Sequence, residues 1–316
     1  MATGTTSVLL IQDVRSTHAY ETARYVLQAG YVGALLWYLG RTGPPANQLP
    51  ELHPQVLPRW RYGAWIPALG IALLFVLTVV ADGGFVILLL LMIVSGVWIL
   101  VAWRREIRWR SIVQGLAVAL LAYLPGMQMA HHGFISKQVL NVFLPLSFPM
   151  YVAGGLLLER TRLGGGQLLA ARYGRALKSL LWGVVLFTPL GLINAAGGAP
   201  GPGITWVTEW QLPLWLSWSS ALAEETWFRL FLVGLCFFLL RPALPTRPAL
   251  AVVAAVLISG LTFGLGHDRT LESFLGTGLL YGVPFAAVFA RRDWEHAVGA
   301  HYMVNFVPWV MAFLAT

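Results

Sequence analysis

Residues 212–240 decide the fold: they read LPLWLSWSSALAEETWFRLFLVGLCFFLL, an apolar run interrupted by Glu224, Glu225 and Arg229. The run is longer than the roughly 20 residues that an α-helix needs to cross a bilayer core, so it is expected to span a membrane. A charged side chain at mid-membrane costs about 2.5–3.5 kcal/mol on insertion scales. Three such side chains in one segment therefore indicate a functional site, and the rest of the chain must supply their partners.

The composition of the whole chain agrees with a membrane protein. Of its 316 residues, 58% are hydrophobic and 11% are charged, which predicts an all-α polytopic membrane helical bundle rather than soluble domains. The net charge of +8 does not indicate nucleic acid as a partner, because the basic residues lie in short clusters between apolar segments. The single cysteine, Cys236, excludes a disulfide framework within one chain.

Nine apolar segments are expected to form helices. They cover residues 64–81, 85–103, 111–124, 139–158, 179–194, 212–240, 249–267, 272–290 and 297–315. Because 111–124 and 179–194 are short, the prediction is eight or nine transmembrane helices with a catalytic cavity inside the bundle. Residues 1–62 then form a cytoplasmic or interfacial amino-terminal region, and residues 63–316 form the membrane domain, with the site in about 210–310.

The distribution of basic residues predicts the orientation of these segments. If all nine cross the bilayer and the amino terminus is cytoplasmic, the inward connections and residues 1–62 together hold 18 of the 21 Lys and Arg residues. This is the positive-inside pattern of multi-pass membrane proteins. The apolar stretch 25–39 is short for a bilayer core, so it is predicted to be an interfacial or packed helix rather than a span. Arginine outnumbers lysine 19 to 2, which favours a GC-rich bacterial source and hence a bacterial cytoplasmic membrane.

The three charges of the opening stretch can be sorted by helix geometry. Glu225 and Arg229 are four residues apart, so they face the same way and can neutralise each other. Glu224 lies about 100° around the helix from Glu225 and should point to another face. A desolvated carboxylate without a full partner suits a general acid or base. The alternative is a structural ion pair between helices, with Glu224 held by hydroxyls such as that of Ser220.

Two further polar elements interrupt later apolar segments. The first is Phe263-Gly264-Leu265-Gly266-His267, and the second is His301-Tyr302-Met303-Val304-Asn305, whose spacing places His301 and Asn305 on one helix face. An imidazole beside a carboxamide suits stabilisation of an oxyanion, whereas a histidine beside a glutamate suits activation of water. A polar hydrogen bond between helices is the alternative for His301 and Asn305. The glycine pairs Gly260/Gly264 and Gly278/Gly282 are spaced for close approach of helix backbones.

The order Glu-Glu-x-x-x-Arg, Phe-x-x-x-His and His-x-x-x-Asn resembles the CAAX protease and bacteriocin-processing family of intramembrane endopeptidases. The resemblance covers about residues 210–310. It implies hydrolysis of a peptide bond near the end of a membrane-embedded or lipid-linked protein or peptide in the lipid bilayer. By this resemblance, Glu224 and His267 activate the attacking water. His301 and Asn305 hold the oxyanion, and the supporting residues are Glu225, Arg229 and Phe263.

The resemblance implies a metal-free, glutamate-type hydrolysis, so no cofactor is expected. The residues agree, since a zinc site normally uses three protein ligands and no His-Glu-x-x-His pair occurs. Zinc held by Glu224, His267 and His301 remains the alternative. The chain departs from the family pattern at Leu230, where glycine is common, and at Asp268, where an apolar residue is usual.

Two other function classes stay open. One is a non-catalytic membrane scaffold or bacteriocin-immunity protein of the same fold. The other is a proton-coupled transporter, although the internal repeats that are common among transporters are absent from the sequence.

The predicted spans also conflict in depth. Simple crossings put His267 at the outer side and His301 at the inner side, so the two meet only if a helix begins or ends within the protein. The expected places for such a break are residues 268–273 and Pro284.

Overall fold

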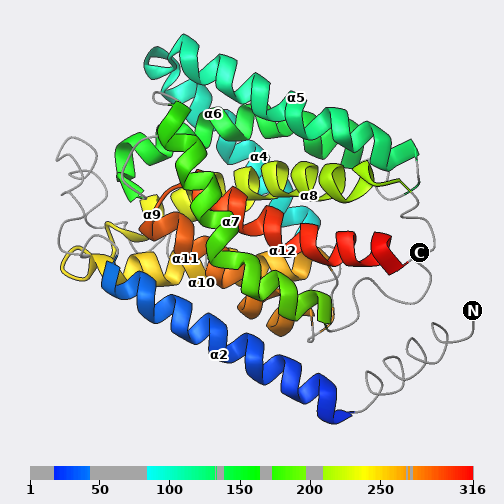
Figure 1. Cartoon of the computed structure of the whole chain (residues 1–316). Helices are drawn as coiled ribbons and strands as arrows, with labels where there is room; N and C mark the ends of the chain where they lie inside the picture. Colours follow the sequence, from blue (N-terminus) through cyan, green and yellow to red (C-terminus); the bar gives the residue numbers. More distant parts are fainter. Residues whose placement is uncertain are drawn as a thin grey trace, which may run out of the picture.

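The computed structural model describes residues 18–42, 84–131, 133, 139–163, 173–196, 209–267, 270 and 273–315, and these ranges form helices and short turns without a strand (Figure 1). The all-α fold is as predicted. The α-helices are α2 (His18–Thr42), α4 (Gly84–Ala102), α5 (Trp109–His131), α6 (Leu144–Thr161), α7 (Tyr173–Ala196), α8 (Gln211–Glu224), α9 (Gly234–Leu240), α10 (Pro248–His267), α11 (Val283–Arg291) and α12 (Trp294–Ala315). A 3₁₀ turn, η3 (Arg104–Glu106), and three π-helices, η4 (Val139–Phe143), η7 (Glu225–Val233) and η8 (Ser273–Gly282), complete the described elements.

Seven helices in the described ranges have the length and apolar composition needed to cross a membrane. They are Phe85–Ala102, Trp109–His131, Val139–Thr161, Gly174–Ala196, Pro248–His267, Ser273–Arg291 and Trp294–Leu314. They correspond to seven of the nine predicted segments, and the two short ones, 111–124 and 179–194, are both extended to 23 residues. The predicted segment 212–240 is one continuous helix made of α8, η7 and α9, and 64–81 lies outside the described residues. The chain is a multi-pass integral membrane protein.

Helix α2 lies along the side of the bundle from one end to the other (Figure 1). The Tyr20 hydroxyl donates to the carbonyl of Ala196, which ends α7. At the other end of α2, the Arg292 guanidinium donates to Thr42 Oγ1 at 2.7 Å. Between these contacts α2 packs on α7 and α11, so it is a packed helix, as predicted. Its 25 residues nevertheless extend over about 37 Å, well beyond the apolar stretch 25–39.

The two ends of the bundle differ in charge. Among the 15 described Lys and Arg residues, one group of 13 gathers at the end where α2, α6, α9 and α11 finish, which we call the basic end. These residues are Arg41, Arg104, Arg105, Arg108, Arg110, Arg160, Arg162, Arg175, Lys178, Arg241, Arg247, Arg291 and Arg292. Arg229 lies in the interior, and Arg24 lies toward the opposite end, where α2 begins. Helix α2 begins at the end opposite the basic end, and the orientation of residues 1–62 relative to the membrane stays a prediction.

The turn between α11 and α12 is recessed into the bundle, which settles the conflict in depth. Trp294 packs edge-on against Tyr151, with ring centroids 5.3 Å apart, and Tyr151 precedes the end of α6 by about 15 Å of helix. His301 then follows the start of α12 by about 10 Å, whereas His267 is the last residue of α10. A break therefore lies at residues 292–293. Pro284 lies in the first turn of α11 without interrupting the span. Of the stretch 268–273, only residues 270 and 273 are described, so a break there stays a prediction.

The antiparallel pair α10 and η8 packs backbone against backbone. A Cβ atom on Gly264 would lie 2.6 Å from the Ser273 carbonyl oxygen and 2.7 Å from the Gly278 nitrogen. One on Gly260 would lie 2.6 Å from the Val283 nitrogen. All three distances are shorter than real Cβ contacts, so the predicted close approach at the glycine pairs is present. This close packing fixes the positions of Phe263 and His267 along the bundle axis relative to the next span.

Candidate active site

Glu225, Arg229 and His301 form a buried charged cluster in the interior of the bundle. The Arg229 Nε atom lies 3.2 Å from Glu225 Oε2, and neither side chain is exposed, so the predicted ion pair is present. His301 Nδ1 lies 2.7 Å from Glu225 Oε1. With Glu225 ionised, Nδ1 of His301 carries the proton and donates, because a carboxylate only accepts hydrogen bonds. Glu225 therefore orients the His301 ring as well as neutralising Arg229.

Two phenylalanine rings enclose this cluster. The Arg229 guanidinium lies 4.2 Å from the Phe263 ring centroid and 5.4 Å from that of Phe285, both within the range of cation–π attraction. Phe285 stacks on the His301 ring at 4.9 Å, and Phe263 meets the same ring edge-on at 5.6 Å. Phe263 thus contacts the cluster as a supporting residue would. The sequence did not predict Phe285, which belongs to an otherwise ordinary apolar span.

Glu224 lies on the open side of the cluster. Its Oε2 atom is 3.9 Å from His267 Nε2 and 3.9 Å from His301 Nε2, and its side chain is 23% exposed. These distances are too long for direct hydrogen bonds, but they suit one water-sized group held between the three side chains. His267 Nδ1 lies 3.0 Å from the Phe263 carbonyl oxygen, to which it donates. This bond leaves the Nε2 lone pair of His267 facing Glu224.

The two glutamates are neighbours on one continuous helix and point to different sides, and the helix changes type between them. Glu224 is the last residue of α8 and Glu225 the first of the nine-residue π-helix η7, whose residues are all buried. π-Helical turns are rare and occur often at functional sites. The predicted divergence of Glu224 and Glu225 is present. The change of helix type was not predicted, since it leaves no mark on the apolar pattern.

Asn305 reaches α8 one turn before Glu224. Its Nδ2 atom donates to Ser220 Oγ at 3.0 Å, while the Ser220 hydroxyl donates to the Leu216 carbonyl at 2.9 Å. The hydroxyl of Ser220 is therefore engaged with Asn305 and with its own helix rather than with Glu224. His301 and Asn305 share one face of α12, as predicted, and that face is directed at α8.

A zinc site would need several His, Cys, Asp or Glu side chains arranged around one point. Among the residues that the structure describes, no group of three or more His, Cys, Asp and Glu side chains is placed to hold a metal ion. Independence of metal stays a prediction.

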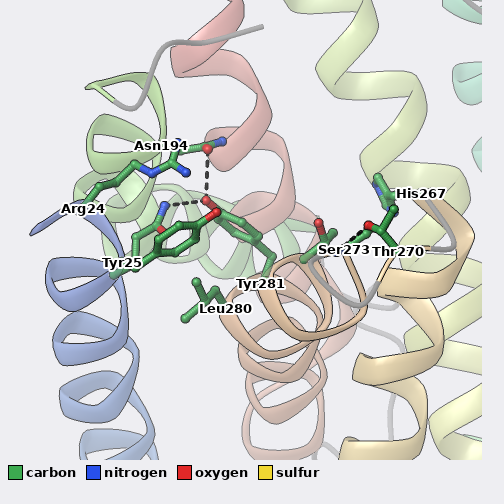
Figure 2. A pocket seen from close by; sticks show the side chains of 11 residues that line it. Arg24, Tyr25, Asn194, His267, Thr270, Ser273, Leu280 and Tyr281 are labelled. Carbon is green, nitrogen blue, oxygen red and sulfur yellow. Dashed lines mark hydrogen bonds between the residues drawn. The ribbon is translucent and has the colours of Figure 1, made fainter. Parts of the chain in front are cut away.

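A polar cavity of about 470 Å³ adjoins the site through His267 (Figure 2). Its lining comes from α2, α7, α10, η8 and the turn at Thr270, and includes Arg24, Gln28, Asn194 and Tyr281. Sequence reasoning missed these four residues. A signal was present for Gln28 and Asn194, which are the only carboxamide side chains in the apolar stretches 25–39 and 179–194.

Comparison with protein families gives a match over residues 205–307, to the Rce1-like family, described as type II CAAX prenyl endopeptidase Rce1-like. No curated protein and no solved structure matches the chain. The matched segment contains all the predicted site residues, from Glu224 to Asn305, and the family implies protease activity of the CAAX type. Helices α2 and α4–α7 lie outside the match. The chain is thus a multi-pass membrane protein whose residues 205–307 match the Rce1-like type II CAAX prenyl endopeptidases, in agreement with the family that its three motifs resemble.

Proposed function

We propose that this protein is an intramembrane endopeptidase that hydrolyses a peptide bond near the end of a membrane-embedded or lipid-linked protein or peptide. One observation carries the proposal: two imidazole Nε2 atoms converge on Glu224 Oε2, each at 3.9 Å, in a partly open site. The buried Glu225–Arg229 pair behind them gives the site a fixed frame. Pre-positioned groups of this kind are what hydrolysis by activated water requires.

In the proposed reaction, a water molecule lies between Glu224 and His267. Glu224 takes one proton from this water as its oxygen attacks the carbonyl carbon of the scissile bond. The tetrahedral intermediate then collapses, the C–N bond breaks, and Glu224 returns the proton to the departing amine. The products are one carboxylate and one amine, so no co-reactant besides water is needed.

The oxyanion of the intermediate is assigned to His301 and Asn305. Asn305 offers its carboxamide N–H groups, one of which now bonds Ser220. His301 donates Nδ1–H to Glu225, so its Nε2 atom must carry a second proton to act as an oxyanion donor. The Glu225 carboxylate is placed to stabilise such an imidazolium, as buried carboxylates do for other catalytic histidines.

The membrane side of the site follows from the charge pattern. His267 and the cavity beside it lie toward the end of the bundle where α2 begins. The 13 basic residues of the basic end lie at the opposite end. The positive-inside pattern assigns the basic end to the cytoplasm, so the site opens toward the outer face of the membrane. The arginine-rich composition favours a bacterial membrane.

The test compares cells that express the wild type with cells that express Glu224→Gln, and identifies new carboxy termini of membrane proteins by mass spectrometry. We expect products in the wild type that decline by about 100-fold or more in the variant, the lower end of the usual contribution of a general base. The matched control is Glu159→Gln, whose carboxylate is 42% exposed in a surface ion pair with Arg108 and should leave the products unchanged. A partner-dependent phenotype that survives Glu224→Gln would instead favour the scaffold or immunity alternative.

Two further measurements, of kcat and KM with purified protein, test the oxyanion donors and the dependence on metal. Asn305→Ala should lower kcat by about 100-fold with little change in KM, which is the usual loss of one oxyanion donor. Ser220→Ala removes the resting partner of Asn305 and should change kcat only slightly; equal losses would make Asn305 a structural residue. Activity should persist in a chelator, and loss that zinc restores would overturn the metal-free mechanism.

A further inference from the structure

We infer that Asn194 of α7 is a positioning residue for Asn305, the proposed oxyanion donor of α12. Asn194 donates a hydrogen bond to the backbone carbonyl of Val304, the residue directly before Asn305. The inference deepens the proposed function and rests on it, because it requires Asn305 to act in the reaction. It extends the functional part of the chain to α7, which lies outside residues 205–307.

A proline inside α12 explains why the Val304 carbonyl needs a donor from another helix. Pro308 lies four residues after Val304, at the position whose N–H would close the α-helical hydrogen bond to that carbonyl. Proline has no N–H, and its ring crowds the carbonyl four residues before it, so the turn around Asn305 loses a bond of the helix. Val304 is 3% exposed, and a buried carbonyl without a donor is costly. Asn194 supplies that donor.

A chain of hydrogen bonds sets the direction of the Asn194 carboxamide. Gln28 Nε2 donates to the Tyr281 hydroxyl at 2.7 Å, and this hydroxyl donates to Asn194 Oδ1 at 2.9 Å. Figure 2 shows the Asn194 carboxamide beside the Tyr281 hydroxyl. Asn194 Nδ2 then faces the Val304 carbonyl at 3.4 Å. Because a backbone carbonyl only accepts, this is the orientation in which the carboxamide is bonded at both of its ends.

Helix α7 is a fixed support for this bond, because it packs on α12 backbone against backbone. A Cβ atom on Gly191 would lie 2.8 Å from the Met303 carbonyl oxygen, and one on Gly183 would meet the His296 carbonyl oxygen. Gly191 lies less than one helical turn before Asn194. The close contact at Gly191 therefore fixes the distance from Asn194 to the turn that it supports.

That turn carries the proposed oxyanion donor. Asn305 lies in it, and His301, one turn earlier, has its Nε2 atom 3.9 Å from Glu224 Oε2. Helices bend sharply at proline, since the ladder of hydrogen bonds is interrupted there. Without the bond from Asn194, the bend at Pro308 would be free to vary and would carry the Asn305 carboxamide away from His301 and Glu224. Asn194 thus acts through Asn305 rather than on the substrate.

The experiment is a double-mutant cycle between Asn194 and Pro308, with the full-length protein in vesicles. The substrate is a lipid-anchored peptide selected from a degenerate library by wild-type cleavage. Asn194→Leu should lower kcat by about 10-fold or more with little change in KM, since misplacement of a catalytic group by 1 Å can cost about 100-fold. Pro308→Ala returns an N–H to the position that faces the Val304 carbonyl. In that background, Asn194→Leu should have little further effect on kcat, because the helix itself supplies the donor.

Two controls are matched to the two substitutions. Pro125→Ala removes a proline inside α5 and should leave the effect of Asn194→Leu at full size. Thr188→Val removes a hydroxyl of α7 that donates to the Val184 carbonyl of the same helix at 2.9 Å, and should leave kcat unchanged. Thermal unfolding of the four members of the cycle reports the bond independently of activity: the loss of stability on Asn194→Leu should be smaller when Pro308 is replaced.

Tyr281→Phe is a milder probe for the same cycle. It keeps Asn194 but removes the hydroxyl that orients the carboxamide. We expect a smaller loss of kcat than for Asn194→Leu, and the loss should again disappear in the Pro308→Ala background. If Asn194→Leu does not fold, Tyr281→Phe decides the test in the same way.

The outcomes separate this inference from the proposed function. A loss of kcat on Asn194→Leu that is as large in the Pro308→Ala background as in the wild type overturns the inference while the peptidase stands. Coupling in thermal unfolding without coupling in kcat does the same, because Asn194 would then be a structural residue only. Both comparisons use ratios, so they do not require Pro308→Ala to be fully active. Wild-type cleavage of no peptide, or cleavage that Glu224→Gln does not reduce, overturns the proposed function and with it the role of Asn305.

Discussion

The buried cluster depends on Glu225, because this residue forms an ion pair with Arg229 through one carboxylate oxygen and a hydrogen bond with His301 through the other. Removing one partner of a buried ion pair leaves an uncompensated charge and typically costs about 3–5 kcal/mol. We therefore expect Arg229→Met to lower the free energy of unfolding by about that amount. The double variant Glu225→Gln/Arg229→Met should recover most of it. Thermal unfolding in detergent measures both.

The matched control for this prediction is Arg108→Met, in a surface pair with Glu159 whose side chains are 73% and 42% exposed. Surface pairs contribute about 0–1 kcal/mol, so this variant should be close to the wild type. The double variant should remain inactive although it is stable, because Glu225→Gln removes the carboxylate that supports a protonated His301. If Arg229→Met cost no more than Arg108→Met, the cluster would not be an essential buried ion pair.

At this scale the sequence predicted which residues gather but not all of their contacts. Helix periodicity was enough to separate Glu224 from Glu225 and to pair Glu225 with Arg229, since both steps use neighbours on one helix. The bond between His301 and Glu225 joins residues 76 apart in the chain, and no local rule predicts such a bond. The motif resemblance implied that His301 and Glu225 belong to one site, but only the packing of α12 on η7 shows that they touch.

The helix pair α10–η8 positions His267, and its close packing yields a prediction at the level of the element. Gly260→Ala would place a Cβ atom 2.6 Å from the Val283 backbone nitrogen, and backbone cannot move aside as a flexible side chain can. The two helices must separate, which shifts Phe263 and His267 relative to Glu224. We expect a fall in peptidase activity of about 10-fold or more, since misplacement of a catalytic group by 1 Å can cost about 100-fold.

Gly33→Ala in α2 is the control, because a Cβ atom there meets nothing within 4 Å. Alanine is the better helix former by about 1 kcal/mol, so this variant should be as active as the wild type and at least as stable. Full activity in Gly260→Ala would mean that the position of His267 along α10 does not depend on the contact between Gly260 and Val283, the first residue of α11.

Elements were predicted best where hydropathy alone defines them. The seven apolar spans follow from length and composition, whereas the π-helices η7 and η8 do not, because a shift from i→i+4 to i→i+5 bonding leaves the apolar pattern unchanged. The recessed start of α12 was needed on geometric grounds but could not be located. Its position depends on where Trp294 packs against Tyr151, a contact between distant parts of the chain.

For the molecule as a whole, α2 is a long described helix that is not among the seven candidate spans. Charges at Glu21, Arg24 and Arg41 leave an uncharged stretch shorter than a bilayer core, so hydropathy excluded it as a span. In the structure its outer face carries Val26, Leu27 and Trp37, each more than 60% exposed, as on a lipid-facing helix. Gln28, by contrast, is turned inward to the cavity. Gln28 thus contributes to the protein interior, and the 25 residues of α2 are as many as a membrane crossing needs.

If α2 crosses the membrane, its first turn is external and its last turn is cytoplasmic, because Thr42 meets Arg292 at the basic end. Cysteine substitutions at the exposed residues Thr22 and Gly40 report which side of the membrane each end of α2 faces. The single native cysteine, Cys236, is buried and should give little background labelling. A membrane-impermeant maleimide should label Thr22→Cys in intact cells and Gly40→Cys only after the cells are opened. Arg105→Cys, at the basic end, serves as the cytoplasmic reference. Labelling of Thr22→Cys that also requires opened cells would put the start of α2 in the cytoplasm, and the cavity at Arg24 would then face cytoplasmic rather than external substrates.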